Sequence, residues 1–312
     1  MADVETIWDG KFIQHMPHDE AIVAQSAGLV QIFEGPDGYQ PGFFMKDPSE
    51  FPFSYTFNPL SLFKPGDIGG LVQTSDIASL FQTRTGPTVP VTGDGDPVEF
   101  ATTQNPGGLS FSRPLTGAGF DYLAGLIAAR EAGASSSTLN TATLGAGFEQ
   151  MTLVGSALLA EVDTPSAIQI TAFQYSAQNT AAFGGAGLAL QRRSDRSARL
   201  TLTTRVPPSG QPSAIINAPN IEHDTKIHVF GAVLDSESST QKVFFNDIED
   251  NPTLAYSPIT SAASVAQLIG FSNLISGGIM SLTAGWFYIN RKLSNNELQN
   301  LKTWFASQQL PS

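Results

Sequence analysis

The chain has 312 residues, of which 41% are hydrophobic and only 14% are charged, and its formal net charge is −12. It contains no cysteine, which excludes disulfides and thiolate chemistry. A strongly negative chain repels phosphate backbones, which argues against nucleic-acid binding. No apolar run approaches the roughly 18 residues expected of a membrane-spanning helix, so membrane insertion is not expected. Sparse charge with 29 glycines and 20 prolines favours an all-β protein rich in turns.

Residues 1–60 form a compositional region of their own, with nine acidic residues against two lysines and many aromatic residues. A strand is predicted over 29–33, and the aromatic alternation of 51–57 predicts another, at a sheet edge because of Pro52. Two interpretations stay open: a small β element packed on the main domain, or a segment for docking and oligomerisation. The second assigns the contacts to Trp8, Phe12, Phe33, Phe43, Phe44, Phe51, Phe53, Tyr55 and Phe57.

Four aspartates of the next segment stand among turn-forming residues. Asp94 and Asp96 flank Gly95, and carboxylates spaced in this way can converge on Ca²⁺. The remaining spacing of an EF-hand loop is absent, and a plain turn is the favoured interpretation. No cofactor is therefore expected, with Ca²⁺ as the alternative.

The middle of the chain predicts a series of short strands. These are 109–111, 151–160, 168–175, 187–191 and 199–205. Residues 119–130 are rich in helix formers and predict a short helix or an insertion.

Residues 226–306 carry the clearest pattern. Period-two runs over 226–235 and 242–247 and a third run over 285–290 predict strands, and Asn246–Asn251 is a cluster of turn formers. Ser294 followed by Glu297 forms a capping box, and an apolar stripe through Leu298, Leu301, Trp304 and Phe305 predicts a helix.

The C-terminal segment HVFGAVLD…QKVFFND…LIGFSN…GWFYINRKLSNNELQNLKTWFA resembles the closing half of a concanavalin A-like, laminin-G-type domain. Asn290–Ser294 matches the turn before that family's closing helix, and Asn246-Asp247 replaces its Asn-Gly turn. The resemblance implies an all-β, concanavalin A-like jelly-roll β-sandwich with a short C-terminal helix, plus a small β-rich N-terminal region. Lectins, glycosidases and adhesion modules share this fold, so it specifies function weakly.

Residues 59–98 are similar to a segment of tailed-phage and prophage structural proteins that precedes a laminin-G-like domain. The family's Trp-Tyr-Asp-Pro-Ser-Asp is Leu71-Val-Gln-Thr-Ser-Asp76 in this chain, so its aromatic pair is missing. Composition predicts a docking and oligomerisation region over 1–60, and the two resemblances imply a connecting segment over 61–108 and the sandwich over 109–312.

Glycosidases of this fold with a retaining mechanism use a Glu-x-Asp-x-x-Glu strand. The best match is Glu161-Val-Asp163-Thr-Pro-Ser166, in which serine replaces the second carboxylate of the necessary pair and Pro165 would break the strand. We therefore expect no enzymatic activity, with a polysaccharide-degrading enzyme as the less favoured hypothesis.

Two polar clusters are candidates for binding carbohydrate. Arg192 and Arg193, with Arg196 and Arg199, are either a solvated hairpin or a contact for acidic polysaccharide or an acidic neighbouring subunit. The turn with Asn246, Asp247, Asp250 and Asn251 offers carboxylates and amides to hydroxyl groups at the rim of a sandwich, or is a solvated hairpin.

These features predict a non-enzymatic virion component of a tailed phage or gene-transfer particle, such as a tail fibre or head spike. Its expected partners are other copies of itself, neighbouring virion proteins and host cell-surface polysaccharide. The alternative is a purely architectural spike base or decoration protein. The acidic N-terminus has no apolar segment typical of a secretory signal, so assembly in the host cytoplasm and release by lysis are expected.

Overall fold

The structure is a computed structural model of the whole chain. It describes residues 3–8, 12–17, 30–34, 41–45, 57–105, 108–115, 119–129, 137–141, 149–159, 168–177, 185–192, 197–204, 213–218, 226–238, 240–252, 267–276 and 282–308. Two compact units are distinguished: Met1–Phe57 with Ser294–Asn300, and Asn58–Leu293 with Leu301–Ser312.

The N-terminal residues form two antiparallel hairpin-like pairs. One joins β1 (Asp3–Trp8) to β2 (Phe12–Pro17), and the other joins β3 (Val30–Glu34) to β4 (Pro41–Met45). The strand predicted over 29–33 is thus confirmed as β3. Of the predicted docking residues, Trp8, Phe12, Phe33, Phe43 and Phe44 lie in these strands. Phe57 lies in no strand or helix, while Phe51, Phe53 and Tyr55 lie outside the described residues.

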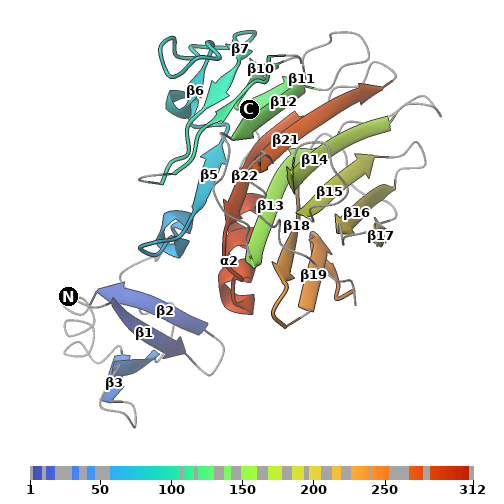
Figure 1. Ribbon diagram of the computed structural model, residues 1–312. Coiled ribbons are helices and arrows are strands. Elements are labelled where there is room, and N and C mark those ends of the chain that lie inside the picture. The colour runs from blue at the N-terminus through green and yellow to red at the C-terminus, as the bar shows by residue number, and fades with distance from the viewer. Residues whose placement is uncertain are drawn as a thin grey trace. The chain divides into compact units, whose positions relative to one another are not determined.

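The larger unit is a sandwich of two antiparallel sheets (Figure 1). The first sheet has the order β20-β19-β18-β13-β22-β11-β10-β7, and β5 also pairs with β22. We call it the covered sheet. Its strands are β5 (Gly69–Gln73), β7 (Pro97–Val98), β10 (Phe120–Leu123), β11 (Leu126–Ala129), β13 (Gln150–Leu158), β18 (Ile227–Asp235), β19 (Thr240–Phe245), β20 (Ile248–Asp250) and β22 (Leu282–Ile289).

The second sheet has the order β17-β16-β15-β14-β21-β12-β9-β8-β6. We call it the open sheet. Its strands are β6 (Leu80–Phe81), β8 (Phe100–Ala101), β9 (Phe111–Ser112), β12 (Ser137–Thr141), β14 (Ile168–Ala177), β15 (Gly185–Arg192), β16 (Ala198–Thr204), β17 (Ser213–Ala218) and β21 (Gln267–Ser276).

The two sheets bury one continuous apolar core between them. Leu188, Leu200 and Ile216 of the open sheet share this core with Phe230 and Trp286 of the covered sheet. Phe111 packs edge-on against both Trp286 and Tyr288, at ring-centroid distances of 5.3 and 5.7 Å. The protein is therefore a jelly-roll β-sandwich with one short C-terminal helix, as the sequence predicts.

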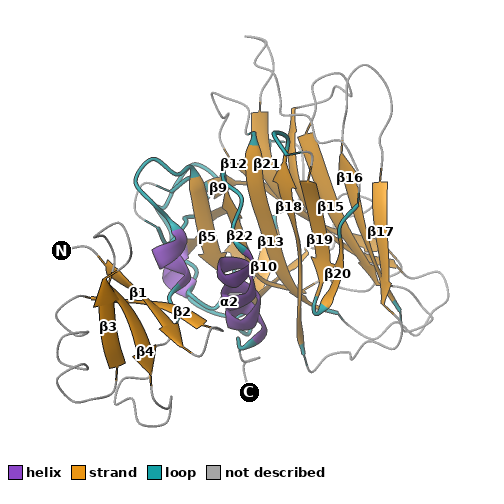
Figure 2. Cartoon of the chain, turned by 90° about the horizontal axis from the view of Figure 1, so that it is seen from below, coloured by secondary structure: helices purple, strands orange, loops and turns teal. Residues whose placement is uncertain are grey.

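The outer face of the covered sheet is also buried. Phe287 packs against Phe63, just beyond the 3₁₀ helix η2 (Pro59–Leu62), with ring centroids 5.3 Å apart. Figure 2 shows the helix α2 (Asn295–Ala306) among the other elements. Its Lys302 places Nζ 5.1 Å from the centre of the Phe244 ring. Burial on both faces explains why β18 is an almost uninterrupted apolar strand. A strand with no face toward solvent does not need polar residues at alternate positions, as in sheets covered on both sides.

Alternation survives in the open sheet. Along β16 the residues alternate between fully buried and partly exposed, with Leu200 and Leu202 directed to the core and Arg199, Thr201 and Thr203 on the outer face. The two sheets therefore differ in what they offer to solvent: the described outer face of the open sheet carries the accessible side chains.

The short helix predicted over 119–130 is wrong, while the alternative of an insertion stays a prediction. Residues 120–129 form the β10–β11 hairpin, whose turn places Ala124 at φ 46° and Gly125 at φ 81°. Helix propensity is outweighed because β11 completes the ladder next to β22 and buries Ile127 in the core. The predicted capping box is confirmed: Ser294 N–H donates to Glu297 and Glu297 N–H donates to the Ser294 hydroxyl.

The domain boundaries proposed from the sequence stay a prediction. Within the structure, β5 to β8 of the segment 61–108 hydrogen-bond to strands of the sandwich, and β5 continues the ladder at β22. No helix among the described residues combines the length and apolarity that crossing a membrane requires.

The close contact between sheet strands at Gly231 gives a stability test. A Cβ at this position would lie 2.4 Å from the Leu153 carbonyl oxygen and 2.5 Å from the Phe244 ring, so Gly231→Ala forces the central ladder apart. We expect a loss of about 2 kcal/mol in the free energy of unfolding. Gly93→Ala is the control, since nothing lies within 4 Å of its Cβ position. Equal denaturant midpoints for the two variants would contradict the expected crowding.

Candidate functional site

One end of the sandwich carries both polar clusters predicted from the sequence. β13 ends at Leu158, where β18 and β22 begin, and β15 ends at Arg192, next to the start of β16. In the open sheet, β21 ends at Ser276, which pairs with Ile168 at the start of β14. The β19–β20 turn lies at this end too. The clusters nevertheless belong to opposite sheets.

The predicted arginine pair is only partly described. Arg192 is the last residue of β15, where it pairs with Ala198 and Gln169, and its side chain is outside the description. Arg193 lies outside the described residues. Their assignment to carbohydrate stays a prediction.

Of the four residues predicted in the β19–β20 turn, Asn246 is hydrogen-bonded within the protein, whereas Asp247, Asp250 and Asn251 are exposed. Asn246 adopts φ 51°, its Oδ1 accepts a 3.0 Å hydrogen bond from Val229 N–H, and its Nδ2 lies 3.0 Å from His228 Nδ1. The buried His228 ring stacks on Phe245. These contacts shape the turn and occupy the Asn246 amide.

Asp247, Asp250 and Asn251 are exposed at and beyond the edge strand β20. Between them, Glu249 bonds with Lys242 at 3.2 Å and with Lys302 of α2 at 3.0 Å. Burial raises the pKa of Glu249, but the two lysines outweigh it and lower that pKa overall. The edge strand is thus fastened to α2, and its free carboxylates belong to Asp247 and Asp250.

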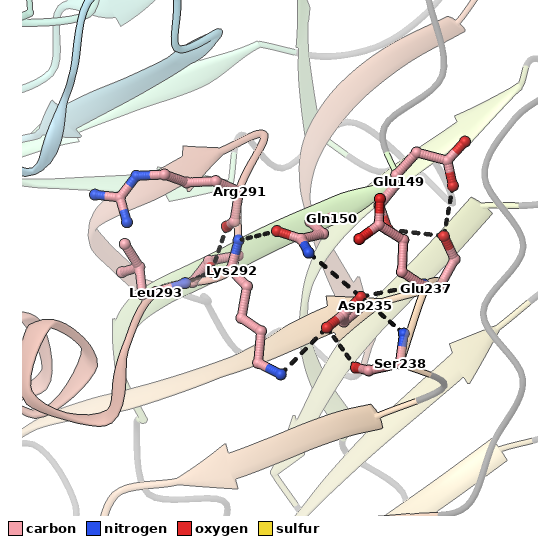
Figure 3. Close-up of polar contacts among 10 residues, drawn as sticks. Glu149, Gln150, Asp235, Glu237, Ser238, Arg291, Lys292 and Leu293 are labelled. Atoms are coloured by element: carbon pink, nitrogen blue, oxygen red, sulfur yellow. Dashed lines mark hydrogen bonds and ion pairs between the residues drawn. The ribbon is translucent and has the colours of Figure 1, made fainter.

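A denser polar cluster lies at the opposite end, around Asp235 (Figure 3). The Asp235 carboxylate accepts hydrogen bonds from the backbone N–H groups of Glu237 (3.1 Å) and Ser238 (3.3 Å) and from the Ser238 hydroxyl. Lys292 Nζ lies 3.2 Å from it, and Gln150 Nε2 lies 3.5 Å away. Because its carboxylate is saturated by donors from its own hairpin and from Lys292, this cluster is a structural clamp.

The clamp continues into the segment before α2. Thr152 donates to the Arg291 carbonyl at 2.9 Å and accepts from Leu293 N–H at 3.2 Å. The Arg291 guanidinium in turn reaches Asp67 at 3.3 Å and the Leu62 carbonyl at 2.5 Å. Residues 291–293 are thereby bonded to η2, to β13 and to the end of β18.

The Asp94–Asp96 segment has the geometry of a turn. One Asp96 oxygen accepts from the N–H and hydroxyl of Thr92, both at 2.8 Å, and from Gln82 at 3.1 Å, while Asp94 accepts from Ala124 N–H at 2.7 Å. The hydrogen bonds from Thr92 lower the pKa of Asp96. Among the described residues, no group of three or more His, Asp or Glu side chains gathers as a metal site. The predicted glycosidase residues Glu161 and Asp163 lie outside the described part.

The remaining candidate is a polar row on the outer face of the open sheet. Gln191 of β15 pairs with Arg199 of β16, which pairs with Asn217 of β17. Ala198 and Leu200 on either side of Arg199 are buried in the core, so Arg199 belongs to the outer face. We call Gln191, Arg199 and Asn217 the amide–guanidinium row.

In the sequence, Arg199 stands close to the other arginines, and nothing there indicates that Gln191 and Asn217 are its neighbours on the adjacent strands. Gln191 and Asn217 are separated from Arg199 by 8 and 18 positions. Only the strand register brings them into one line, at roughly 4.8 Å per strand. The partly exposed Arg199 has a buried Nε without a hydrogen-bond partner.

No protein-family model matches the chain, and no curated protein matches its sequence. Several solved structures are similar in fold. One is the carbohydrate recognition domain of Emp46p in its potassium-bound form, with 10% identity, a TM-score of 0.41, and coverage of 57% of this chain and 88% of that one.

Two others are the binding domain of botulinum neurotoxin DC in complex with rat synaptotagmin II and the receptor binding domain of botulinum neurotoxin D. Their identities are 9% and 13%, their TM-scores 0.42 and 0.41, and they cover 75% and 74% of this chain. The match spans about half of each botulinum domain, 53% in both cases. At these values the likeness says nothing about what this chain binds.

The Asp235 clamp gives a pH-dependent prediction. Burial raises the pKa of Asp235, but the hydrogen bonds from Ser238 and the charge of Lys292 outweigh it and lower that pKa from 3.8 to about 2. Because the folded-state pKa is the lower one, the stabilisation is complete above pH 4 and is lost as the pH falls toward 2. At pH 7, Asp235→Asn should lower the free energy of unfolding by about 2 kcal/mol.

Thermal melts of Asp235→Asn and wild type from pH 7 down to pH 2 check this expectation. The gap in melting temperature should close near pH 2. Asp250→Asn, which removes an exposed carboxylate in β20, should follow wild type throughout. A gap that is independent of pH would show that the Asp235 charge is not the cause.

Proposed function

We propose that this chain is a non-catalytic adhesion component of a tailed phage or phage-like particle, a tail fibre or head spike, and that its sandwich binds cell-surface glycan. The observation that carries the glycan part is the composition of the open sheet's outer face. Its partly exposed side chains in β12, β15 and β16 are mainly uncharged hydroxyl and amide groups: Thr138, Asn140, Gln191, Thr201 and Thr203.

Such groups suit a glycan because sugars are recognised by many uncharged hydrogen bonds to hydroxyl groups. Each net hydrogen bond adds only about 1 kcal/mol, so a broad face is needed. The rigid ladder between β15, β16 and β17 holds these side chains in fixed rows, which limits the conformational entropy lost on binding. The exposed Ile215, paired with Thr201, adds an apolar contact for the carbon side of a sugar ring.

The particle context rests on the similarity of residues 59–98 to a phage structural segment. In the structure, this segment supplies η2 and β5 to β7, so it is built into the same unit as the sandwich. The N-terminal aromatic residues would then contact neighbouring subunits of the particle. An architectural role without glycan binding is the outcome expected if no glycan is retained.

The glycan proposal predicts a specific loss. Thr201→Val with Thr203→Val removes two outer-face hydroxyls without changing side-chain shape, and affinity for the host polysaccharide should fall about tenfold. Thr303→Val, on the exposed side of α2, is the control and should bind as wild type. Biolayer interferometry on immobilised host polysaccharide gives the affinities. Equal affinities for all three proteins would remove the open sheet from the proposal, and shortened polysaccharide chains after incubation would overturn its non-catalytic part.

The docking proposal predicts a change in oligomeric mass. If the N-terminal aromatic residues join copies of the chain, Phe43→Ser with Phe44→Ser should reduce the assembly to a smaller species in light scattering. Phe100→Ser, a change in the partly exposed strand β8 of the sandwich, is the control. An unchanged monomeric mass for wild type and both variants would contradict self-association through this region.

A further inference from the structure

Arg199 is an unusual residue for the place it occupies. It lies on the outer face of β16, between strands β15 and β17, and its guanidinium is the one cation among the described outer-face side chains of β12, β15, β16 and β17. No described residue forms an ion pair or a side-chain hydrogen bond with it, and its Nε is buried without a partner. Because Arg199 is partly exposed while its Nε is buried, an anionic ligand would bind the accessible part of the guanidinium.

The flanking side chains define what that ligand looks like. Gln191 on one side and the exposed Asn217 on the other each present an uncharged amide with both donors and an acceptor. Across three strands the row spans roughly 10 Å, longer than one sugar ring. Thr201 and Thr203 continue the same face along β16 with hydroxyl groups. The single guanidinium of Arg199, with neutral amide and hydroxyl groups around it, is complementary to a ligand that carries one carboxylate and several hydroxyl groups.

The net charge of the chain further restricts the class of anionic ligand that the row can bind. The chain carries a net charge of −12, so a dense polyanion such as a phosphate polymer meets general repulsion. Binding of such a polymer takes several cations, whereas the described face offers one. A carboxylate can instead form two parallel hydrogen bonds with a guanidinium, which strengthens the pair and fixes its orientation.

We propose that the amide–guanidinium row is a subsite for a carboxylated sugar, with Arg199 binding the carboxylate and Gln191 and Asn217 binding neighbouring hydroxyl groups. This inference rests on the proposed glycan-binding function and names its ligand class as a uronate-type acidic glycan. The acidic N-terminal region of a second copy is the competing occupant, and the experiment separates the two.

The test uses the full-length chain and polygalacturonate as the probe, with carboxyl-reduced polygalacturonate as the matched neutral polymer. Wild type should bind the acidic polymer at least tenfold more tightly than the reduced one. Arg199→Gln should lose tenfold or more of the affinity for polygalacturonate. Arg199→Lys keeps the positive charge but lacks the planar guanidinium. Its affinity for polygalacturonate should therefore lie between those of wild type and Arg199→Gln.

Arg84→Gln is the control for charge alone. Arg84 is similarly half-buried and lies just beyond β6, at the far edge of the same sheet, so this variant should bind as wild type. Equal melting temperatures for both glutamine variants confirm that the fold is retained.

The outcomes are separable. If Arg199→Gln binds polygalacturonate as wild type does, or if wild type binds the reduced polymer equally well, the subsite is wrong while glycan binding stands. If wild type retains neither of these polymers nor host polysaccharide, both the subsite and the proposed function fail. If Arg199→Gln instead dissociates an oligomer of a protein that retains no polymer, the occupant is a second copy and the inference is overturned.

Discussion

The short segment between β22 and α2 is the constraint on which the rest of the sandwich depends. Asn290 accepts a 2.8 Å hydrogen bond from Ile68 N–H, Arg291 holds Asp67 and the Leu62 carbonyl, and Lys292 pairs with Asp235. Ser294 then caps α2. Asn290 and Arg291 thus join stretches of chain that are more than 200 positions apart, while Lys292 holds the end of β18.

The packing on the covered sheet decides where ligands can be bound. Phe63, just beyond η2, and Lys302 of α2 pack on the covered sheet, and its central strands β13, β18 and β22 are buried on both faces. The open sheet keeps the alternation of buried and accessible side chains. Its strand register places Gln191, Arg199 and Asn217 side by side on three neighbouring strands. The difference between the two sheets follows from what packs behind them, since both are built from similar antiparallel ladders.

Local signals made part of the fold predictable. The capping box at Ser294, the turn at Asn246 and the period-two strands are encoded within a few neighbouring residues, and all are found in the structure. The β10–β11 hairpin was missed because its strands are specified by pairing with β22, far along the chain. The amide–guanidinium row was missed for the same reason: cross-strand register places Gln191 and Asn217 beside Arg199. The hydrogen bonds of Asn246 with Val229 and His228 also could not be predicted, because they leave no mark in the sequence, and its role in carbohydrate binding stays a prediction.

The three-residue strand β20 has a further consequence for copies of this chain held close together. It ends the covered sheet, and an exposed sheet edge is a template on which another chain can add a strand. Here the edge is very short, its three residues are all exposed, and two of them, Glu249 and Asp250, are acidic. Because Glu249 is paired with Lys242 and Lys302, the uncompensated charge of this strand is that of Asp250, and a second copy would bring its own Asp250 carboxylate to the same acidic edge. Strand addition by a second copy is therefore disfavoured at this edge.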